Sequence, residues 1–293
     1  MRLLNTSTLN LHYFGDDIPL YVILSHVWGR GEVTFDDIDK SHAKGMLGYK
    51  KIAECCDKAV QDGFEWVWID TCCIDKKSSA ELSEAINSMY RWYWQAEICY
   101  AYLKDVAEDE DYVDEKSKFQ TSRWFQRGWT LQELLAPTVV EFYGRSWGLL
   151  GTKSSLLDAV HAATKIEKKY LVDRDLIKNA SVATKFSWAS LRRTTRTEDM
   201  AYCLLGLVHV NMPMLYGEGE RAFFRLQLEI IKQTNEHTIF AWNPNTGDSR
   251  PSLGVLAPSP TFFKLSTQIS SHDWKKTPSS TYEMTNRGLR MKL

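Results

Sequence analysis

The chain has 293 residues, a length that allows one large domain or two smaller ones. Its 36 lysines and arginines nearly balance 37 aspartates and glutamates, and the formal net charge of −1 argues against a general nucleic-acid binder. Hydrophobic residues make up 44% and charged residues 25%, which is typical of a globular protein and excludes disorder as the main state.

The six cysteines and the lack of long apolar runs favour a reducing compartment inside the cell. No run approaches the roughly 18 apolar residues that cross a bilayer, and no secretory leader opens the chain. Cysteines stand in adjacent pairs at 55–56 and 72–73, without zinc-site spacing, and adjacent cysteines rarely bridge each other. We therefore expect buried thiols, no metal site, no membrane span and a cytoplasmic location.

Strands alternate with helices in the first half of the chain. A helix is expected around residues 52–60, with Gly63 as its stop, and a second over 80–95 with Ser78 or Ser79 as its cap. Short buried strands are expected at 21–25, 66–70, 98–103 and 138–143. This alternation predicts parallel βαβ units and hence an α/β fold.

Two segments between the last two strands have their own character. Residues 105–115 carry seven acidic side chains, and we expect a solvated loop, because the run lacks the glycine-centred spacing of a calcium loop. Residues 122–134 are expected to form a turn that enters a helix.

The second half of the chain is predicted to be mostly helical. Helices are expected at 156–163, 183–191, 199–208 and 220–232, and strands at 237–242 and 282–293. The predicted organisation is an α/β core over 1–150, a helical extension over 151–236 and a β-containing tail over 237–293. Because the chain stops inside an apparent strand, we expect further domains beyond it.

Residues 217–222 (GEGERA) imitate the G-x-G-x-x-A fingerprint of dinucleotide-binding folds. Such a site needs a preceding strand, whereas here Pro213 precedes the glycines in a helical region and two acidic residues lie within the motif. A turn at the start of a helix is the better interpretation.

Other catalytic motifs are missing or weak. Neither a Walker-type phosphate loop nor a G-x-S-x-G elbow occurs in the sequence. A nucleophilic Cys72 or Cys73 working with His26 is the weaker alternative to buried thiols.

Several ordered motifs resemble the fungal heterokaryon incompatibility (HET) domain. Residues 21–29 (YVILSHVWG), 68–75 (WIDTCCID) and 122–133 (SRWFQRGWTLQE) are similar to its first three blocks. The segments 187–190, 196–202, 214–219, 240–242 and 285–289 are similar to segments that follow. The resemblance implies an effector of nonself recognition that triggers programmed cell death. It also implies self-association and a fusion to, or activation by, a nucleotide-binding oligomerisation receptor.

The first part of the chain also resembles, more distantly, a TIR domain with a flavodoxin-like parallel sheet. Residues 21–29 are similar to the first strand and loop of that family, 63–70 with 81–86 to the second strand and the loop after it, and 129–134 (WTLQEL) to its Trp-Cys-x-x-Glu-Leu stretch. In enzymatic TIR domains this glutamate is essential for cleaving NAD, and Glu133 holds its position here. Thr130 replaces the family's cysteine.

An NAD-cleaving site needs a carboxylate for the ribosyl cation, an aromatic wall and cations for phosphate. Glu133 would supply the first, while the other candidates are Ser25, His26, Trp28, Gly29, Arg30, Asp70, Arg127 and Trp129. Ser25 and Asp70 end expected strands, and the turn at 29–31 follows the first of them, where open α/β sheets bind ligands. Each has a structural alternative, since the tryptophans can be packing residues, Glu133 can pair with an arginine, and Asp70 and His26 can hold a turn.

Two functions follow from these expectations. The first is a cell-death effector that hydrolyses NAD, as a substrate and not as a cofactor, at the nicotinamide glycosidic bond when oligomerised. The second is a TIR-like module that relays the death signal by self-association alone. The two differ in whether Glu133 is needed for turnover.

Overall fold

The computed structural model describes residues 1–109, 112, 117–244, 254–269, 283–285 and 288–290. Parts of the predicted acidic loop (110–111 and 113–116) and of the predicted strand at 282–293 lie outside these residues. The chain forms two compact units, one of residues 1–125 and 133–174 and one of residues 126–132 and 175–293. The predicted domain boundaries at 150 and 236 stay predictions.

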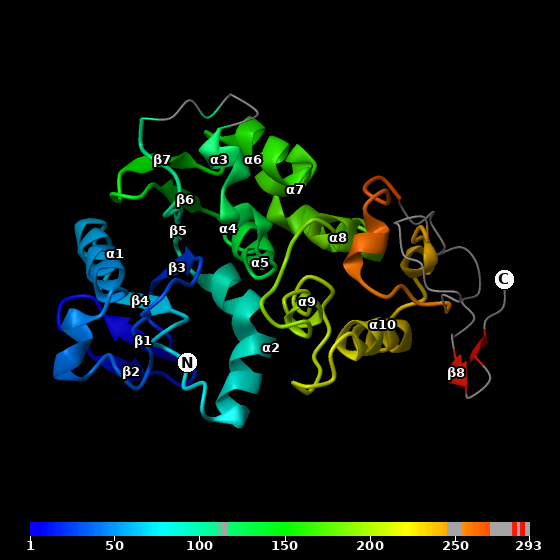
Figure 1. The fold of residues 1–293 in the computed structure, drawn as a ribbon, viewed down its shortest axis with the longest axis horizontal. Helices are drawn as coiled ribbons and strands as arrows, with labels where there is room; N and C mark the ends of the chain where they lie inside the picture. The colour runs from blue at the N-terminus through cyan, green and yellow to red at the C-terminus, as the bar shows by residue number, and fades with distance from the viewer. Residues whose placement is uncertain (110–111, 113–116, 245–253, 270–282, 286–287, 291–293) are drawn as a thin grey trace. The chain divides into compact units, whose positions relative to one another are not determined.

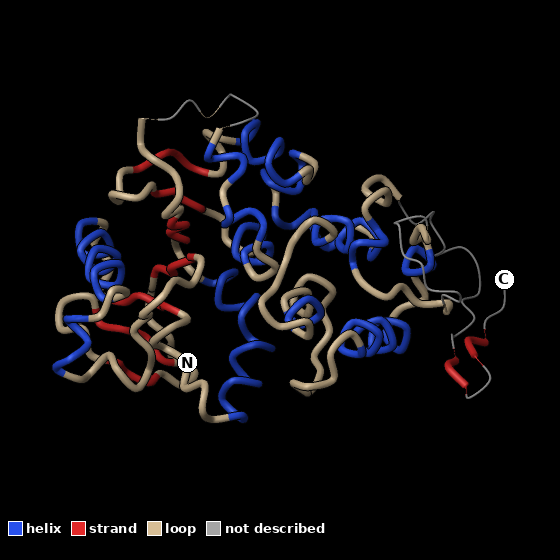
Figure 2. The backbone as a smooth tube through the Cα atoms, in the orientation of Figure 1, coloured by secondary structure: helices blue, strands red, loops and turns tan. Residues whose placement is uncertain are grey.

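The first unit is built on a seven-stranded mixed sheet (Figure 2). The strand order is β2-β1-β4-β3-β5-β6-β7, and the central strands β4, β3, β5 and β6 run parallel. The strands are β1 (Arg2–Asn5), β2 (Leu11–Tyr13), β3 (Val22–His26), β4 (Trp66–Ile69), β5 (Cys99–Tyr102), β6 (Val140–Tyr143) and β7 (Leu149–Thr152). The α/β fold with a parallel core is thus confirmed, while the antiparallel edge strands β1, β2 and β7 were not predicted.

Helices cover both faces of this sheet (Figure 1), and the strand register explains how. Ile23 pairs with Trp68 and with Cys99, so these three side chains share one face, and Tyr100, one position later, points to the other. Trp68 packs against Trp92 of α2 (Ser79–Gln95), with ring centroids 5.5 Å apart. Tyr100 instead hydrogen-bonds the carboxylate of Asp62, which follows α1 (Tyr49–Gln61).

Both helices form where the spacing of apolar residues and the end signals predicted them. The buried face of α1 carries Ile52, Cys55, Cys56 and Ala59, and Gly63 follows its end with a φ of +83°. Ser78 caps α2, because its hydroxyl accepts a hydrogen bond from the Glu81 amide at 3.3 Å. A short 3-10 helix, η1 (Ser41–Gly45), precedes α1.

Short helices follow β5, and the described acidic residues of the loop before them fix neighbouring turns. These helices are α3 (Lys118–Thr121), α4 (Arg123–Gln126) and α5 (Thr130–Leu135), and α6 (Leu157–Thr164) and α7 (Lys168–Val172) come after β7. The Asp105 carboxylate accepts hydrogen bonds from the Ser122 hydroxyl at 2.7 Å and the Arg123 amide at 2.9 Å. Residues 122–134 include two short helices, α4 and most of α5, whereas the sequence predicted one turn leading into a single helix.

The second unit is mainly helical among its described residues. It contains most of η2 (Arg174–Asn179), together with α8 (Val182–Ala189), α9 (Asp199–Tyr202), α10 (Arg221–Gln233), η3 (His237–Phe240), η4 (Pro260–Phe263) and the antiparallel pair β8 (Glu283–Thr285) and β9 (Gly288–Arg290). The helix expected over 199–208 ends at Tyr202, and turns follow it. No helix of the described residues is long and apolar enough to cross a bilayer.

The strand predicted at 237–242 is wrong, because this segment forms the 3-10 helix η3. Its side chains serve the start of α8. The carboxylate of Glu236 accepts the Val182 amide at 2.9 Å, and the Thr238 hydroxyl accepts the Ala183 amide at 3.2 Å. A helix start leaves such amides without internal partners, and the tight turn at 236–238 supplies them.

Candidate functional site

Glu133 and Ser25 meet at the carboxyl end of β3. Ser25 is fully buried, and its hydroxyl donates a hydrogen bond to the Glu133 carboxylate while accepting one from Nε1 of Trp124 at 2.8 Å. Glu133 is 7% exposed and reaches this point from α5. Burial and the nearby Glu133 charge raise the pKa of the Tyr93 phenol well above its usual range. The sequence-predicted pair therefore lies together in an enclosed, strongly polar setting.

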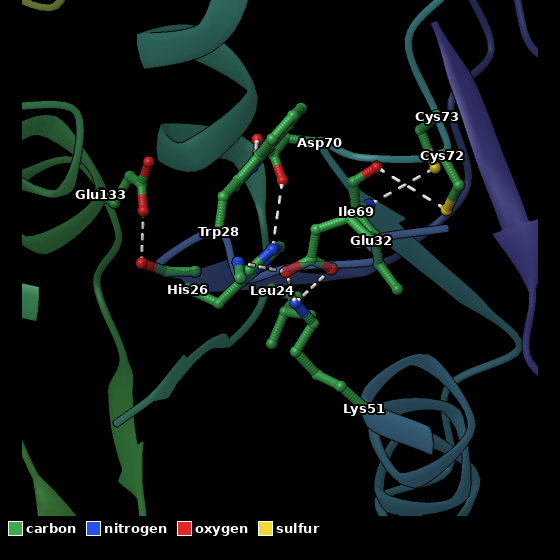
Figure 3. Close-up of polar contacts among 12 residues, drawn as sticks. Leu24, His26, Trp28, Glu32, Lys51, Ile69, Asp70, Cys72, Cys73 and Glu133 are labelled. Atoms are coloured by element: carbon green, nitrogen blue, oxygen red, sulfur yellow. Dashed lines mark hydrogen bonds and ion pairs between the residues drawn. The ribbon is translucent and has the colours of Figure 1, made fainter. Parts of the chain in front are cut away.

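Trp28 and Asp70 form a second contact at the ends of β3 and β4 (Figure 3). Nε1 of Trp28 donates to Oδ2 of Asp70 at 2.7 Å, and the indole is 43% exposed. The ammonium of Lys76 lies 3.5 Å from the centre of the Trp28 ring. Burial lowers the Lys76 pKa, while the Asp70 charge opposes this shift. The half-exposed indole is thus fixed on its edge by a carboxylate and on its face by a cation.

His26 lies beneath this contact with its ring enclosed. Nε2 is 3.8 Å from Oδ1 of Asp70, beyond hydrogen-bond distance, and neither ring nitrogen has a hydrogen-bond partner among the described residues. Burial, assisted by the Lys51 charge, lowers the His26 pKa well below its usual range. The imidazole is therefore neutral at physiological pH. Unpartnered buried polar groups are rare in proteins, and they mark a place where another polar molecule can bind.

The glycine turn after β3 already has an internal partner. The Glu32 carboxylate accepts the Gly29 amide at 2.7 Å and the Lys51 ammonium at 2.6 Å. Burial lowers the pKa of Lys51, and the charge of Glu32 opposes this shift. Arg30 is exposed and lines a hollow of about 170 Å³ beside this turn. The Gly29 amide is thus occupied by Glu32, whereas the Arg30 side chain faces open space.

The two remaining candidates belong to the second unit. Nη1 of Arg127 donates to the Thr195 hydroxyl at 3.1 Å, and the half-buried Trp129 hydrogen-bonds Asp199. Burial raises the Asp199 pKa, although the hydrogen bonds from Tyr216 and Trp129 oppose the rise. The described contacts of both residues are therefore made within their own unit, and their assignment to the NAD site stays a prediction.

The imitation of a dinucleotide fingerprint at 217–222 is a turn at the start of α10. The carboxylate of Glu198 accepts the amides of Gly217 at 2.7 Å and Gly219 at 3.0 Å. These hydrogen bonds lower the pKa of Glu198. Two amides that a phosphate would need are therefore used by the protein's own carboxylate, which supports the interpretation as a structural turn.

All six cysteines are buried and unbridged, as predicted. The hydrogen bond between the Cys72 and Cys73 side chains, together with burial, raises the pKa of Cys72 well above its usual range, so its sulfur is a protonated thiol and a poor nucleophile. Among the described residues no group of three or more histidine, cysteine or acidic side chains is placed to hold a metal ion.

Sequence reasoning missed three charged members of the site: Glu32, Lys51 and Lys76. Glu32 binds the Gly29 amide and Lys51, and Lys76 contacts Trp28, which is 48 positions away. No local sequence spacing predicts such contacts. The available signal was weak: Glu32 directly follows the glycine turn, Lys51 directly precedes the expected helix, and Lys76 stands six residues after an expected strand.

Comparisons with known proteins agree with the motifs. The family model for the heterokaryon incompatibility protein (HET) matches residues 21–118, which include Ser25, Trp28 and Asp70 but not Glu133. The chain is 48% identical over 222 residues to vegetative incompatibility protein HET-E-1 of Podospora anserina. That alignment covers 73% of this chain and 16% of the relative, so the chain spans only a small part of that protein's length. No solved structure matches.

Proposed function

The chain contains a heterokaryon incompatibility (HET) domain, and on this premise we propose that it is an effector domain of fungal heterokaryon incompatibility. In this proposal it triggers programmed cell death by hydrolysing NAD at the nicotinamide glycosidic bond. Activity requires self-association, which a fused or partner nucleotide-binding oligomerisation receptor brings about.

The observation that carries the enzymatic part is the Ser25–Glu133 hydrogen bond at the carboxyl end of β3. Ligands of open α/β sheets bind beyond the carboxyl ends of the strands. The contact supports the proposal, because the Glu133 carboxylate, which resembles a TIR catalytic residue, reaches this end of the sheet. Trp28, half-exposed at the same strand end, offers a ring face for stacking a base.

The reaction that this arrangement supports is an ordinary hydrolysis. The bond between the ribose C1′ and the nicotinamide ring nitrogen breaks, and its electron pair neutralises the cationic ring. A ribosyl cation develops, and the Glu133 carboxylate stabilises it after exchanging its hydrogen bond with Ser25 for the ribose hydroxyls. Water adds its oxygen to C1′ and releases a proton, so that the products are nicotinamide, ADP-ribose and one proton.

A second function is favoured by a different observation, namely the enclosure of Glu133. A carboxylate that is 7% exposed and bonded to a buried hydroxyl also fits a purely structural role. The domain would then relay the death signal by self-association without turnover. The two functions make opposite predictions for a variant that keeps the shape of Glu133 but removes its charge.

The test is nicotinamide release from NAD by the purified domain, artificially clustered, followed by chromatography. Glu133→Gln keeps the volume and the acceptor oxygen for Ser25. Its matched control is Glu141→Gln on β6, whose carboxylate also accepts a hydroxyl hydrogen bond, from Tyr143. The enzymatic function predicts release by the unchanged domain and by Glu141→Gln, and at least a hundredfold less by folded Glu133→Gln.

Cell killing separates the remaining outcomes. If the clustered domain releases no nicotinamide and Glu133→Gln still kills cells, the enzymatic proposal fails and the self-association function stands. If Glu133→Gln releases as much nicotinamide as the unchanged domain, Glu133 is not the catalytic carboxylate. Circular dichroism and the unfolding midpoint of each variant establish that it is folded.

A further inference from the structure

The hollow beside the glycine turn collects positive charge. It has a volume of about 170 Å³ and is lined by the loop after β3, the start of α1, the end of β5 and the turn between β6 and β7. Five cationic and two anionic side chains line it: Arg30, Lys50, Lys51, Lys104, Arg145, Glu32 and Glu54. The lining therefore carries three more positive than negative charges.

The two carboxylates are already matched to two of the cations. Glu32 pairs with Lys51 at 2.6 Å, and this pair is largely enclosed, with side-chain exposures of 8% and 11%. Glu54 pairs with Lys50 at 3.5 Å on the surface of α1. The three cations left over, Arg30, Lys104 and Arg145, have no ion-pair partner among the described residues. An excess of unmatched cations around one hollow favours an anionic ligand.

Backbone hydrogen bonds of Arg145 hold this side of the hollow in place. The Arg145 amide donates to the Val106 carbonyl at 2.8 Å, and its own carbonyl accepts the Tyr102 hydroxyl at 3.0 Å. Nε of Arg145 donates to the Lys104 carbonyl at 3.2 Å. The Glu108 carboxylate, which lies against this turn, accepts the Ser146 amide at 2.7 Å. The guanidinium is therefore anchored at Nε, and the Nη groups remain for a ligand.

The opposite wall is fixed by a close backbone approach. Gly48 precedes α1, and a Cβ at this position would lie 2.8 Å from Cα of Glu32. Glycine therefore lets the loop after β3 lie against the start of the helix. The first turn of α1 carries no acidic residue, so its amide dipoles add positive potential to the hollow.

We infer that this hollow is a phosphate-binding subsite that takes the diphosphate of a nucleotide ligand. Arginine forks and lysines around a hollow match phosphate oxygens, and Val27 and Gly29 of its lining flank Trp28 in the sequence. The choice of NAD as that ligand rests on the proposed function, whereas the recognition of phosphate rests on the charges alone.

The experiment compares binding of ADP-ribose, ADP and adenosine to the domain by calorimetry. The variant is Lys104→Gln with Arg145→Gln, and the matched control is Arg123→Gln, an exposed arginine of the same unit outside the hollow. We expect the double variant to bind ADP-ribose and ADP at least tenfold more weakly and to lose part of the salt dependence. Adenosine binding and the control should be unchanged.

The inference is overturned if the unchanged domain binds neither phosphate ligand, or if the double variant binds both as well as the control does. Turnover distinguishes this failure from that of the proposed function. Phosphate-dependent binding without nicotinamide release would keep the subsite and remove the enzyme. Release of nicotinamide with a KM for NAD that the double variant leaves unchanged would keep the enzyme and remove the subsite.

Discussion

The hydroxyl of Ser25 donates a hydrogen bond to the carboxylate of Glu133, although 108 positions separate the two residues. Ser25 lies one residue before the end of the buried strand β3, and Glu133 lies on the short helix α5. The contact therefore joins the first and third HET-like blocks of the sequence. Because it is buried, it contributes to the stability of the first unit whether or not Glu133 is catalytic.

Ser25→Ala should lower the free energy of unfolding by about 1–3 kcal/mol, because it removes one partner from a carboxylate and one from Nε1 of Trp124 in a buried place. The control is Ser88→Ala, at a buried serine whose hydroxyl accepts a hydrogen bond from Arg91 at 3.2 Å. Urea unfolding followed by circular dichroism measures both. Equal losses for the two variants would show that the Ser25 contacts contribute nothing special.

Acidification should destabilise the domain through His26. Burial holds its pKa well below the value of about 6.5 in the unfolded chain, so the unfolded state takes up the proton first. The stability is therefore intact above pH 6.5 and falls below it. Between pH 7.5 and 5.5 the contribution of His26 should drop by about 1.4 kcal/mol, as one proton is taken up on unfolding.

Unfolding curves of His26→Gln at both pH values measure this contribution by difference. The variant should lose less stability than the unchanged chain, while His42→Gln, at an exposed histidine, should lose as much. A pH dependence that survives in His26→Gln would assign the effect to other groups.

The central strands and the helices α1 and α2 could be predicted from the sequence because their signals are local. Strand β3 is a continuous apolar run, and Ser78 precedes α2 as a cap. Strand β2 is short and mostly exposed, and β1 pairs with β4 across some 60 residues, so neither leaves a local pattern. The η3 segment has an apolar pattern that suits a strand, but its role as a cap for α8 depends on tertiary contacts.

In the candidate site, too, residues with a local sequence signal could be predicted, whereas contacts between distant segments could not. Ser25 and Asp70 could be found because each is the last residue of a predicted strand. The pairing of Lys51 with Glu32 and the position of Lys76 over Trp28 could not be predicted. These contacts join segments that are 19 and 48 residues apart, and they depend on how those segments pack against each other. Charge was visible in the sequence, but the clustering of Lys104 and Arg145 at one hollow was not.

Trp68→Ala should lower the free energy of unfolding by about 3–5 kcal/mol. The side chain is fully buried and packs against Trp92 and Tyr93 of α2. Its Nε1 has no hydrogen-bond partner among the described residues, so Trp68→Phe keeps most of the packing and should cost about 1–2 kcal/mol. Chemical unfolding measures both, and equal costs would mean that the indole nitrogen, and not the ring packing, decides the stability.

Lys76→Met should leave the free energy of unfolding unchanged or raise it by up to about 1 kcal/mol. The ammonium is buried without a hydrogen-bond partner among the described residues, and methionine fills the space without that cost. Burial lowers the Lys76 pKa, so the unfolded chain holds this proton more tightly and the unchanged domain gains stability as the pH rises into the alkaline range. The variant should lack that gain.

Unfolding at pH 7 and pH 9.5 tests this, with Lys77→Met as the control, since the neighbouring Lys77 is exposed and pairs with Asp36 at 2.8 Å. A loss of more than about 1 kcal/mol at pH 7 in Lys76→Met would show that the contact with the Trp28 ring outweighs the cost of burial. A gain would mean that the chain keeps a destabilising cation beside Trp28 and Asp70. Such a cation is expected where a ligand supplies the missing partner.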